Sequence, residues 1–375
     1  MANISHASFT FATQYMGILP HYSPLQFTHH CVTINYQITG ASKLSAKKKA
    51  TKSKSIKKPV KKATNKRKSA QRKKRSPFGF ILAAVFVVAG LVGYAFMGNA
   101  DFLDDISRAL GITADADQGP VLPVDGEIIV HFLDVGQGDA ALIQTPSGSV
   151  LIDGGDNHMG ERVADYLRGV GISELTYVIA THPHADHIGG LVTVLDQFPV
   201  GTLIMPPVAH TTLTFERFLD AIEYNNIPLR EPVVGSTFSV GDAHFTIIGP
   251  NSTGHSNLND YSVSLRMTHG AMGFIFTGDA EAAAEWQILD AGHNVSADVL
   301  RVGHHGSSTS TTQEFLDAVN PSIAVINVGA DNRYGHPHNT VLSRLRVAGV
   351  RIYRTDDHGN IAIVSNGANL SVHHD

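Results

Sequence analysis

The segment Thr181–His187 limits the possible folds of this chain more than any other stretch. It reads Thr-His-Pro-His-Ala-Asp-His, and it directly follows the apolar run Tyr177–Ala180. A short apolar run bounded by turn-forming residues predicts a buried strand. The loop at its end carries four potential metal ligands, which are His182, His184, Asp186 and His187. Because imidazole and carboxylate groups bind zinc, manganese or iron well, the segment predicts a metal site at the edge of a sheet.

Other predicted strands also end in potential ligands. One apolar run leads to Asp279, a second leads to His304 and His305, and a third, upstream, leads to Asp153. A sheet forms a rigid site when several strand ends deliver ligands to one edge. The only cysteine is Cys31, far upstream of these motifs, so a metal here must be held by His, Asp or Glu.

From Gly126 onward, short apolar strands alternate with helical stretches. The predicted strands are Ile128–Leu133, Ala140–Gln144, Val150–Ile152, Tyr177–Ala180, Thr202–Met205, Phe245–Ile248, Val263–Met267, Phe274–Thr277, Val299–Val302, Ile323–Val328 and Ile361–Val364. The predicted helices are Arg162–Gly169, Phe215–Tyr224, Ala280–Asp290, Gln313–Val319 and Thr340–Val347. This order predicts an α/β fold in which helices cover sheets.

The charge of the chain is divided into two blocks. Residues 1–75 carry 17 Lys and Arg and no acidic residue, whereas the remainder carries 12 Arg and all 33 Asp and Glu. The net charge is therefore +17 before Ser76 and −21 after it, although the whole chain sums to only −4. So strong an asymmetry excludes a uniform single-domain enzyme and indicates two compartments or two kinds of partner.

The basic block lies in a segment without a predicted fold. Residues 1–40 show no clear period and receive no assignment, and a start at Met16 or a later codon stays open. Residues 41–77 are Lys-rich and have too little apolar surface to offset chain entropy, so they are predicted to be a disordered tail. Two compatible interpretations stay open for this tail: it sets membrane topology, or it binds anionic lipid or nucleic acid.

Residues 78–98 are predicted to be a transmembrane anchor. They form a run of 21 uncharged residues, long enough to cross ~30 Å of hydrocarbon as a helix. The positive-inside rule puts the N-terminus in the cytoplasm and residues 127–375 outside the cell, after an acidic linker at 99–126. A signal peptide cleaved near Ala100 is the alternative, but the apolar run exceeds the ~7–15 residues of such signals.

Taken together, the motifs resemble the metallo-β-lactamase superfamily. The shared features are the His-x-His-x-Asp-His loop, the Asp-Gly pair before it, and the later Gly-Asp and His. The finer resemblance is to the extracytoplasmic hydrolase domain of ComEC-type competence proteins, and it rests on Leu133–Ala140, Thr181–Gly190, His304–Ser307 and Tyr334–His338. It covers about residues 127–375. It implies a four-layer αββα sandwich with a dinuclear metal site where the two sheets meet.

The resemblance also implies two divalent ions, zinc or manganese, and a set of ligands. These ligands are His182 and His184 for the first ion, Asp186, His187 and His304 for the second, and Asp279 as the bridge. In one place this chain departs from many superfamily members, which supply another histidine to the first ion. The corresponding stretch, Asn257–Ser262, contains none, although His255 lies near.

Several other motif residues have two interpretations, and both stay open. Asp153 either orients the histidines or binds metal. Asp134 and Asp139 either organise a turn or lie near the site. His305 either replaces His304 as a metal ligand or orients the ligands without binding metal. A further group contacts substrate or only caps, packs and turns, namely Asn259, Ser307, His336 and His338.

A hydrolytic mechanism follows from two metals that activate a water molecule. Asp186 is predicted to orient that water, and His305 and His338 are predicted to stabilise the oxyanion or leaving group. Outside the motifs, His131 and His210 are predicted to be surface or core histidines without a catalytic role.

Three functions remain open. The first is hydrolysis of nucleic acid outside the cell, because in ComEC-type proteins the hydrolase domain is thought to degrade the DNA strand that is not imported. The second is hydrolysis of a small ester, lactam, lactone or cell-wall phosphoester, which the acidic charge of the domain favours. The third is a membrane-tethered binding module whose basic tail collects anionic partners. One predicted span leaves no multi-span channel in this chain, which weakens a direct transfer of the ComEC-type role.

Overall fold

The computed structural model describes residues 123–375. The predicted Lys-rich tail, the predicted anchor and nearly all of the predicted linker lie outside these residues. Within residues 123–375, no helix is long and apolar enough to cross a membrane.

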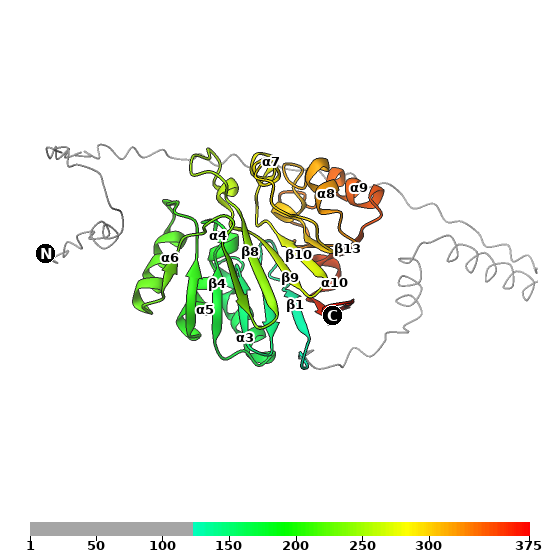
Figure 1. Ribbon diagram of the computed structural model, residues 1–375. Helices are drawn as coiled ribbons and strands as arrows, with labels where there is room; N and C mark the ends of the chain where they lie inside the picture. Colours follow the sequence, from blue (N-terminus) through cyan, green and yellow to red (C-terminus); the bar gives the residue numbers. More distant parts are fainter. Residues whose placement is uncertain (1–122) are drawn as a thin grey trace, which may run out of the picture. The chain divides into compact units, whose positions relative to one another are not determined.

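Two β-sheets form the centre of the fold (Figure 1). The first has eight strands in the order β15-β14-β1-β2-β3-β4-β5-β6, and the second has seven in the order β13-β12-β11-β10-β9-β8-β7. The strands of the first sheet are β1 (Ile128–Phe132), β2 (Ala141–Thr145), β3 (Gly148–Ile152), β4 (Leu175–Ile179), β5 (Val200–Ile204), β6 (Leu229–Arg230), β14 (Ile361–Ser365) and β15 (Leu370–His374). Those of the second are β7 (Thr237–Val240), β8 (Ala243–Gly249), β9 (Ser264–His269), β10 (Met272–Phe276), β11 (Val299–Arg301), β12 (Ile323–Ile326) and β13 (Arg351–Arg354).

Helices cover the outer face of each sheet. Against the first sheet lie α3 (Gly160–Gly169), α5 (Leu191–Gln197) and α6 (Leu213–Tyr224), together with the short α4 (Ala185–Ile188). Against the second lie α7 (Ala282–Asp290), α8 (Gln313–Val319) and α9 (Asn339–Val347). The short α10 (Thr355–His358) and the 3-10 turns η1 (Asn157–Met159), η2 (Leu258–Tyr261) and η3 (Gly303–Gly306) complete the chain. The predicted αββα sandwich is therefore the observed architecture.

The central strands, such as β1 and β2, are buried on both faces, because each sheet lies between another sheet and a helical layer. On β1, Val130 and Phe132 point into the core between the sheets, where Phe132 stacks on Phe276 of the second sheet. The intervening His131 points the other way, toward Tyr166 on α3. This alternation follows from the two-residue repeat of a strand.

Parallel pairing brings the ligand-bearing strand ends to one edge. In the first sheet, β3 runs parallel to β4, and in the second, β10, β11 and β12 run parallel to one another. The carboxyl ends of parallel strands lie side by side, so the loops after them meet. Asp153 and Thr181 follow β3 and β4, and Asp279 and His304 follow β10 and β11.

Candidate metal centre

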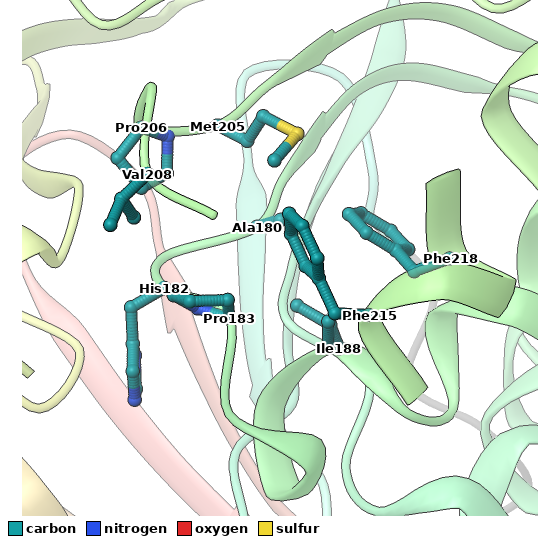
Figure 2. A pocket seen from close by; sticks show the side chains of 9 residues that line it. All are labelled: Ala180, His182, Pro183, Ile188, Met205, Pro206, Val208, Phe215 and Phe218. Atoms are coloured by element: carbon teal, nitrogen blue, oxygen red, sulfur yellow. The ribbon is translucent and has the colours of Figure 1, made fainter. Parts of the chain in front are cut away.

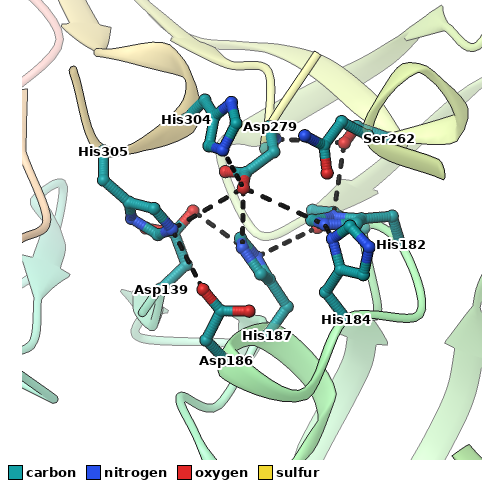
Figure 3. A network of polar contacts seen from close by, with 12 residues as sticks. Asp139, His182, His184, Asp186, His187, Ser262, Asp279, His304 and His305 are labelled. Carbon is teal, nitrogen blue, oxygen red and sulfur yellow. Dashed lines mark hydrogen bonds and ion pairs between the residues drawn. The ribbon is translucent and has the colours of Figure 1, made fainter. Parts of the chain in front are cut away.

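Asp279 lies at the centre of a cluster of histidines (Figure 3). Its Oδ2 atom is 3.2 Å from His187 Nε2, 3.6 Å from both His304 Nε2 and His305 Nε2, and 4.0 Å from His182 Nε2. The side chain is buried, and it reaches this position because the chain leaves β10 through Gly278, whose φ of +53° lies in the left-handed region. One carboxylate thus faces imidazoles from both sheets.

His182 and His184 lie on the first-sheet side of Asp279. His182 Nε2 is 2.9 Å from His184 Nδ1, and the two rings meet edge to face. The other ring nitrogen of His182 faces Thr181 Oγ1 at 3.1 Å and Ser262 Oγ at 3.4 Å. The ring is therefore held so that Nε2 points toward His184 and Asp279.

His187 is oriented by Asp153. His187 Nδ1 donates to Asp153 Oδ2 at 2.8 Å, so Nε2 faces Asp279. The Asp153 carboxylate is fixed in turn by the Thr181 amide at 2.8 Å and the Thr181 hydroxyl at 2.7 Å. Asp153 adopts a φ of +57°, a conformation that costs a non-glycine residue about 1 kcal/mol or more. A carboxylate behind an imidazole is the usual device for orienting a metal-binding histidine.

His305 groups with Asp186 and His187. One ligand atom from each of these three residues lies within 4.8 Å of the others. His305 Nδ1 donates to the Asn327 carbonyl at 3.0 Å, and its Nε2 is 3.4 Å from Asp186 Oδ2. His305 thus occupies the position that the resemblance implied for His304.

His304 and His305 nevertheless both face Asp279. In an extended chain, adjacent side chains point to opposite sides. Here both residues adopt left-handed conformations, with φ of +49° and +53°, and this tight turn brings both Nε2 atoms to the same carboxylate. His304 is also 3.3 Å from Glu281 through its Nδ1 atom. Glu281 was not predicted as a site residue, because the sequence marks it only by its position two residues after Asp279.

Arg301 is a second residue whose role the motifs did not reveal. It is 3% exposed, it forms an ion pair with Asp139, and its Nη1 donates to the Gly278 carbonyl at 2.6 Å. Its Nη2 lies 3.4 Å from His305 Nδ1. Arg301 therefore ties the Asp139 loop of the first sheet to the Gly278 turn of the second.

Asp134 and Asp139, both in the loop between β1 and β2, lie in different surroundings. Asp139 lies in the site, with Oδ2 3.7 Å from His187 Nδ1. Asp134 turns away, where it accepts from the Gly136 amide at 3.0 Å and pairs with Arg162 at 2.9 Å on the surface. A Cβ at Gly138 would lie 2.5 Å from the Asp186 carbonyl, so only glycine lets this loop approach the histidine loop.

The stretch that lacks a third histidine, Asn257–Ser262, still borders the site. The Asp279 amide donates to Ser262 Oγ at 3.0 Å, and Ser262 also faces His182. Asn259 is buried, and its amide donates to Glu281 Oε1 at 3.1 Å. These polar side chains hold the surrounding residues where other superfamily members supply an imidazole.

The remaining predicted residues lie on the second-sheet side. The His336 ring is 5.5 Å from that of His304 and 4.8 Å from that of His338. His338 precedes α9 and accepts from the Ser308 amide at 2.8 Å. Ser307 is buried, but its hydroxyl contacts Thr309 Oγ1 at 3.0 Å.

The apolar pocket beside His182 supports the histidine loop (Figure 2). Its lining includes Pro183 from the loop, Ile188 from α4, and Phe215 and Phe218 from α6. These side chains pack behind His182, so the loop rests on a hydrophobic cluster. Nearby, His210 lies 3.2 Å from the Pro183 carbonyl through Nδ1, and its ring is 5.7 Å from that of His184. His210 was predicted from the sequence to be a surface or core histidine without a catalytic role.

The site is strongly coupled electrostatically. Burial alone would raise the pKa of Asp279, but the charges of His187 and His305 outweigh burial and hold this pKa well below its usual value. Burial would likewise lower the pKa of His187, but Asp279 and Asp153 raise it well above the ordinary range. Burial, followed by the charge of His187, lowers the pKa of His182. Burial also lowers the pKa of Arg301, to about 9.

The donor set fits divalent metal ions. Three buried polar atoms that face the centre form no well-aligned hydrogen bond within residues 123–375, and these are His187 Nε2, His305 Nε2 and Asp279 Oδ1. Leaving buried polar atoms unpaired costs about 1–3 kcal/mol each, so their convergence indicates a missing partner. Imidazole nitrogens and carboxylate oxygens suit a divalent cation.

Comparison with known proteins agrees with this geometry. The family model described as the metallo-beta-lactamase superfamily matches residues 133–329. ComE operon protein 3 of Bacillus subtilis is 34% identical over 260 residues, which cover 64% of this chain and 33% of that protein. Recombination protein 2 of Haemophilus influenzae is 34% identical over 221 residues, which cover 58% of this chain and 26% of that protein. Competence protein ComA of Neisseria gonorrhoeae is 28% identical over 234 residues, which cover 62% of this chain and 31% of that protein. The chain thus spans about a third of the length of these relatives or less.

Proposed function

Because this chain belongs to the metallo-β-lactamase superfamily and is a metal-dependent hydrolase of that fold, we propose that it hydrolyses phosphodiester bonds of nucleic acid. The observation that carries the proposal is the convergence on Asp279, where His187, His304 and His305 place nitrogens within 3.6 Å of one carboxylate oxygen. Such a cluster would hold two cations close together, the arrangement that serves in-line displacement at phosphorus.

The side chains divide between two metal positions. His182 and Asp279 belong to one group of donors, which also includes His187, and Asp186, His187 and His305 form another. His182 and His184, whose facing ring nitrogens are 2.9 Å apart, would hold one ion with Asp279, and the second group would hold the other. When bound, the ions, zinc or manganese, supply an activated water molecule and offset the negative charge that develops on the phosphoryl oxygens.

The protein groups around the ions supply orientation. Asp153 holds the His187 ring, and Asn327 holds the His305 ring through its carbonyl. Asp186 would orient the attacking water by accepting a hydrogen bond from it. Burial would raise the pKa of Asp186, but the contact with His305 and the charge of His187 lower it below the ordinary value, so the carboxylate stays ionised and able to accept that bond. His338, whose Nδ1 accepts from the Ser308 amide, would stabilise the leaving group through its other ring nitrogen.

Support for a nucleic-acid substrate comes from the relatives. Competence protein ComA is named for competence, and the similarity of ComE operon protein 3 covers 64% of this chain. The matched stretch is about a third of the length of each relative or less, so the complete activity of the relatives does not transfer with the similarity. The proposal concerns the hydrolase domain alone.

A small ester, lactam, lactone or cell-wall phosphoester is the second candidate substrate. Residues after Ser76 carry a net charge of −21, and a surface so acidic repels long polyanions. Small substrates do not meet this repulsion.

The experiment compares three substrates on the full chain loaded with Mn²⁺ or Zn²⁺. They are single-stranded DNA, bis-p-nitrophenyl phosphate and a chromogenic β-lactam. DNA and diester cleavage that disappears in His184→Ala supports the proposal. Turnover of the lactam without any diesterase activity refutes it and favours the second candidate.

The proposed function also includes a cellular location for the hydrolase domain. We propose that residues 78–98 anchor the chain in the cell membrane, with the N-terminus in the cytoplasm and the hydrolase domain outside, and that the Lys-rich tail contacts anionic lipid or nucleic acid. The distribution of basic residues before Ser76 supports this orientation. Protease treatment of intact cells removes the domain if the orientation is correct and spares it if the domain is cytoplasmic.

A further inference from the structure

A row of rings leads from the metal centre to the surface. The Tyr334 ring stacks on that of His336, with centroids 5.6 Å apart and planes 23° apart. His336 in turn meets His304 at 5.5 Å. Two ring-to-ring steps therefore connect Tyr334 to a histidine that faces Asp279.

Tyr334 is exposed although it is close to the site. Its side chain is 49% exposed, and it lies on the loop between β12 and α9. Arg333 lies beside it, fully exposed, with its guanidinium 4.9 Å from the ring centroid and Nη2 donating to the Tyr334 hydroxyl at 2.7 Å. An aromatic ring and a cation thus stand together at the rim.

The loop holds this pair in place without burying it. The side chain of Asn332 donates to the Gly329 carbonyl at 2.9 Å and to the His336 carbonyl at 2.6 Å. The same side chain accepts from the Tyr334 amide at 3.2 Å and the His336 amide at 3.0 Å. Four hydrogen bonds from one residue fix the loop before any ligand arrives, so binding costs little conformational entropy.

Arg333 also brings a positive charge to this rim. The hydrogen bond to Tyr334, and more weakly the charge of Asp186, raise the pKa of Arg333. Arg333 thus places a positive charge beside Tyr334, on a domain whose sequence is otherwise acidic.

We propose that Tyr334 is a stacking platform for a nucleobase of a single-stranded nucleic acid, and that Arg333 contacts a phosphate next to that base. This inference rests on the proposed phosphodiesterase function. Every nucleobase has a π-face, so stacking on a tyrosine is tolerant of sequence. A duplex keeps its bases stacked on one another, whereas a single strand leaves them free for an aromatic side chain. The platform therefore selects unpaired strands and sets the base beside the scissile phosphate.

The test uses the full chain and two oligonucleotides of equal length, an oligothymidylate and an abasic strand. Binding is measured by fluorescence anisotropy in EDTA, and kcat/KM is measured with Mn²⁺. Tyr334→Ala should weaken oligothymidylate binding roughly 5- to 100-fold, since stacking on one aromatic residue accounts for an effect of that size. Binding of the abasic strand should stay within about 2-fold, because it has no base to stack.

Two further variants separate stacking from other effects. Tyr334→Phe keeps the ring and should bind oligothymidylate like the unaltered chain. Tyr224→Ala removes a tyrosine that is 84% exposed at the end of α6, and it should change neither affinity. Arg333→Ala should weaken both strands and reduce the slope of log affinity against log salt by about 1, as expected for one lost phosphate contact.

The outcomes distinguish the two proposals. Equal losses for both strands in Tyr334→Ala, or no loss for oligothymidylate, overturn the platform. If the unaltered chain cleaves neither strand, the phosphodiesterase proposal fails, while the binding contrast in EDTA still decides the platform.

Discussion

His131 and His187 are both buried imidazoles in the first-sheet half of the domain, yet their surroundings are opposite. Gln144 donates through Nε2 to the Val170 carbonyl, so its Oε1 accepts from His131 Nε2, at 3.2 Å. The Tyr166 hydroxyl donates to His131 Nδ1 at 3.1 Å. Both ring nitrogens of His131 are therefore satisfied within the protein, whereas His187 Nε2 has no hydrogen-bond partner among the described residues.

The difference shows what marks a functional histidine. Burial is common to both residues, so burial does not separate them. Burial lowers the pKa of His131 to about 4, because only the hydrogen bond to Gln144 opposes it. At His187, the charges of Asp279 and Asp153 outweigh burial. His131 is neutral and both of its ring nitrogens are paired with neutral groups, whereas His187 lies between the carboxylates of Asp153 and Asp279.

Replacement of Asp279 has the largest expected effect, because it removes the carboxylate that distinguishes the surroundings of His187 from those of His131. Asp279→Ala removes the carboxylate that faces the site histidines, so we expect hydrolysis to fall by about 10³-fold or more, together with the bound metal. Steady-state kinetics and elemental analysis measure the two losses. Asp290→Ala, at the exposed end of α7, should retain both. Full activity in Asp279→Ala would remove the basis for the site.

The pH dependence of stability tests the other side of the comparison. The folded state holds His131 neutral down to about pH 4, whereas the unfolded chain protonates it near its ordinary value of 6.5. Stability from this residue is therefore complete above about pH 6.5 and is lost as the pH falls toward about 4. The loss totals about 3 kcal/mol.

Urea unfolding across this range, compared between the unaltered chain and His131→Gln, isolates the effect from other titrating groups. The difference in pH slope between the two proteins should vanish above about pH 6.5. Parallel pH profiles throughout the range would show that His131 is not held neutral.

Asp153→Asn tests whether Asp153 orients the His187 ring. Asn keeps only one acceptor oxygen and no charge, so its NH2 group must face either His187 Nδ1 or the Thr181 amide, both of which donate to Asp153. The ring is then held less firmly, and we expect about a 10- to 100-fold loss in metal affinity or activity. Asp165→Asn, on exposed α3 surface, is the matched control. A change in KM alone would assign Asp153 to substrate binding.

Tyr166→Phe has the smallest expected effect. It leaves His131 Nδ1 buried without a donor, which should reduce the free energy of unfolding by about 1 kcal/mol. Activity should not change, because His131 lies behind the first sheet. Urea denaturation gives the energy, and a loss of activity without a loss of stability would connect this cluster to the site.

The ligand positions could be predicted because their chemistry is visible in the sequence. A run of histidines and aspartates after an apolar strand has few structural explanations, so the Thr181–His187 loop was recognised without a structure. Arg301 reads as an ordinary strand residue, and only the pairing of distant segments reveals its contact with Asp139. The positions of His304 and His305 depended on left-handed backbone geometry, which residue types alone do not specify.

The missed fold elements have a similar cause. β7 alternates exposed Thr237 and Ser239 with buried Phe238 and Val240, too short a pattern to separate from a loop. β13 begins and ends with arginine, and β15 is mostly exposed, so neither shows the apolar run of a central strand. α5 is rich in β-branched residues, which favour strands, and its packing under α3 and α6 decides the outcome.

The pairing of β1 with β14 has a consequence for how the domain is made. Ile128 pairs with Ser365 and Phe132 with Ile361, so the first strand of the domain pairs with a strand from the far end of the domain. Until β14 has been synthesised and has folded back, β1 has only β2 beside it and presents an open edge to other chains. Contacts so distant in sequence also form slowly. The first sheet therefore stays incomplete until β14 pairs, and a fragment ending at residue 329 would lack that strand.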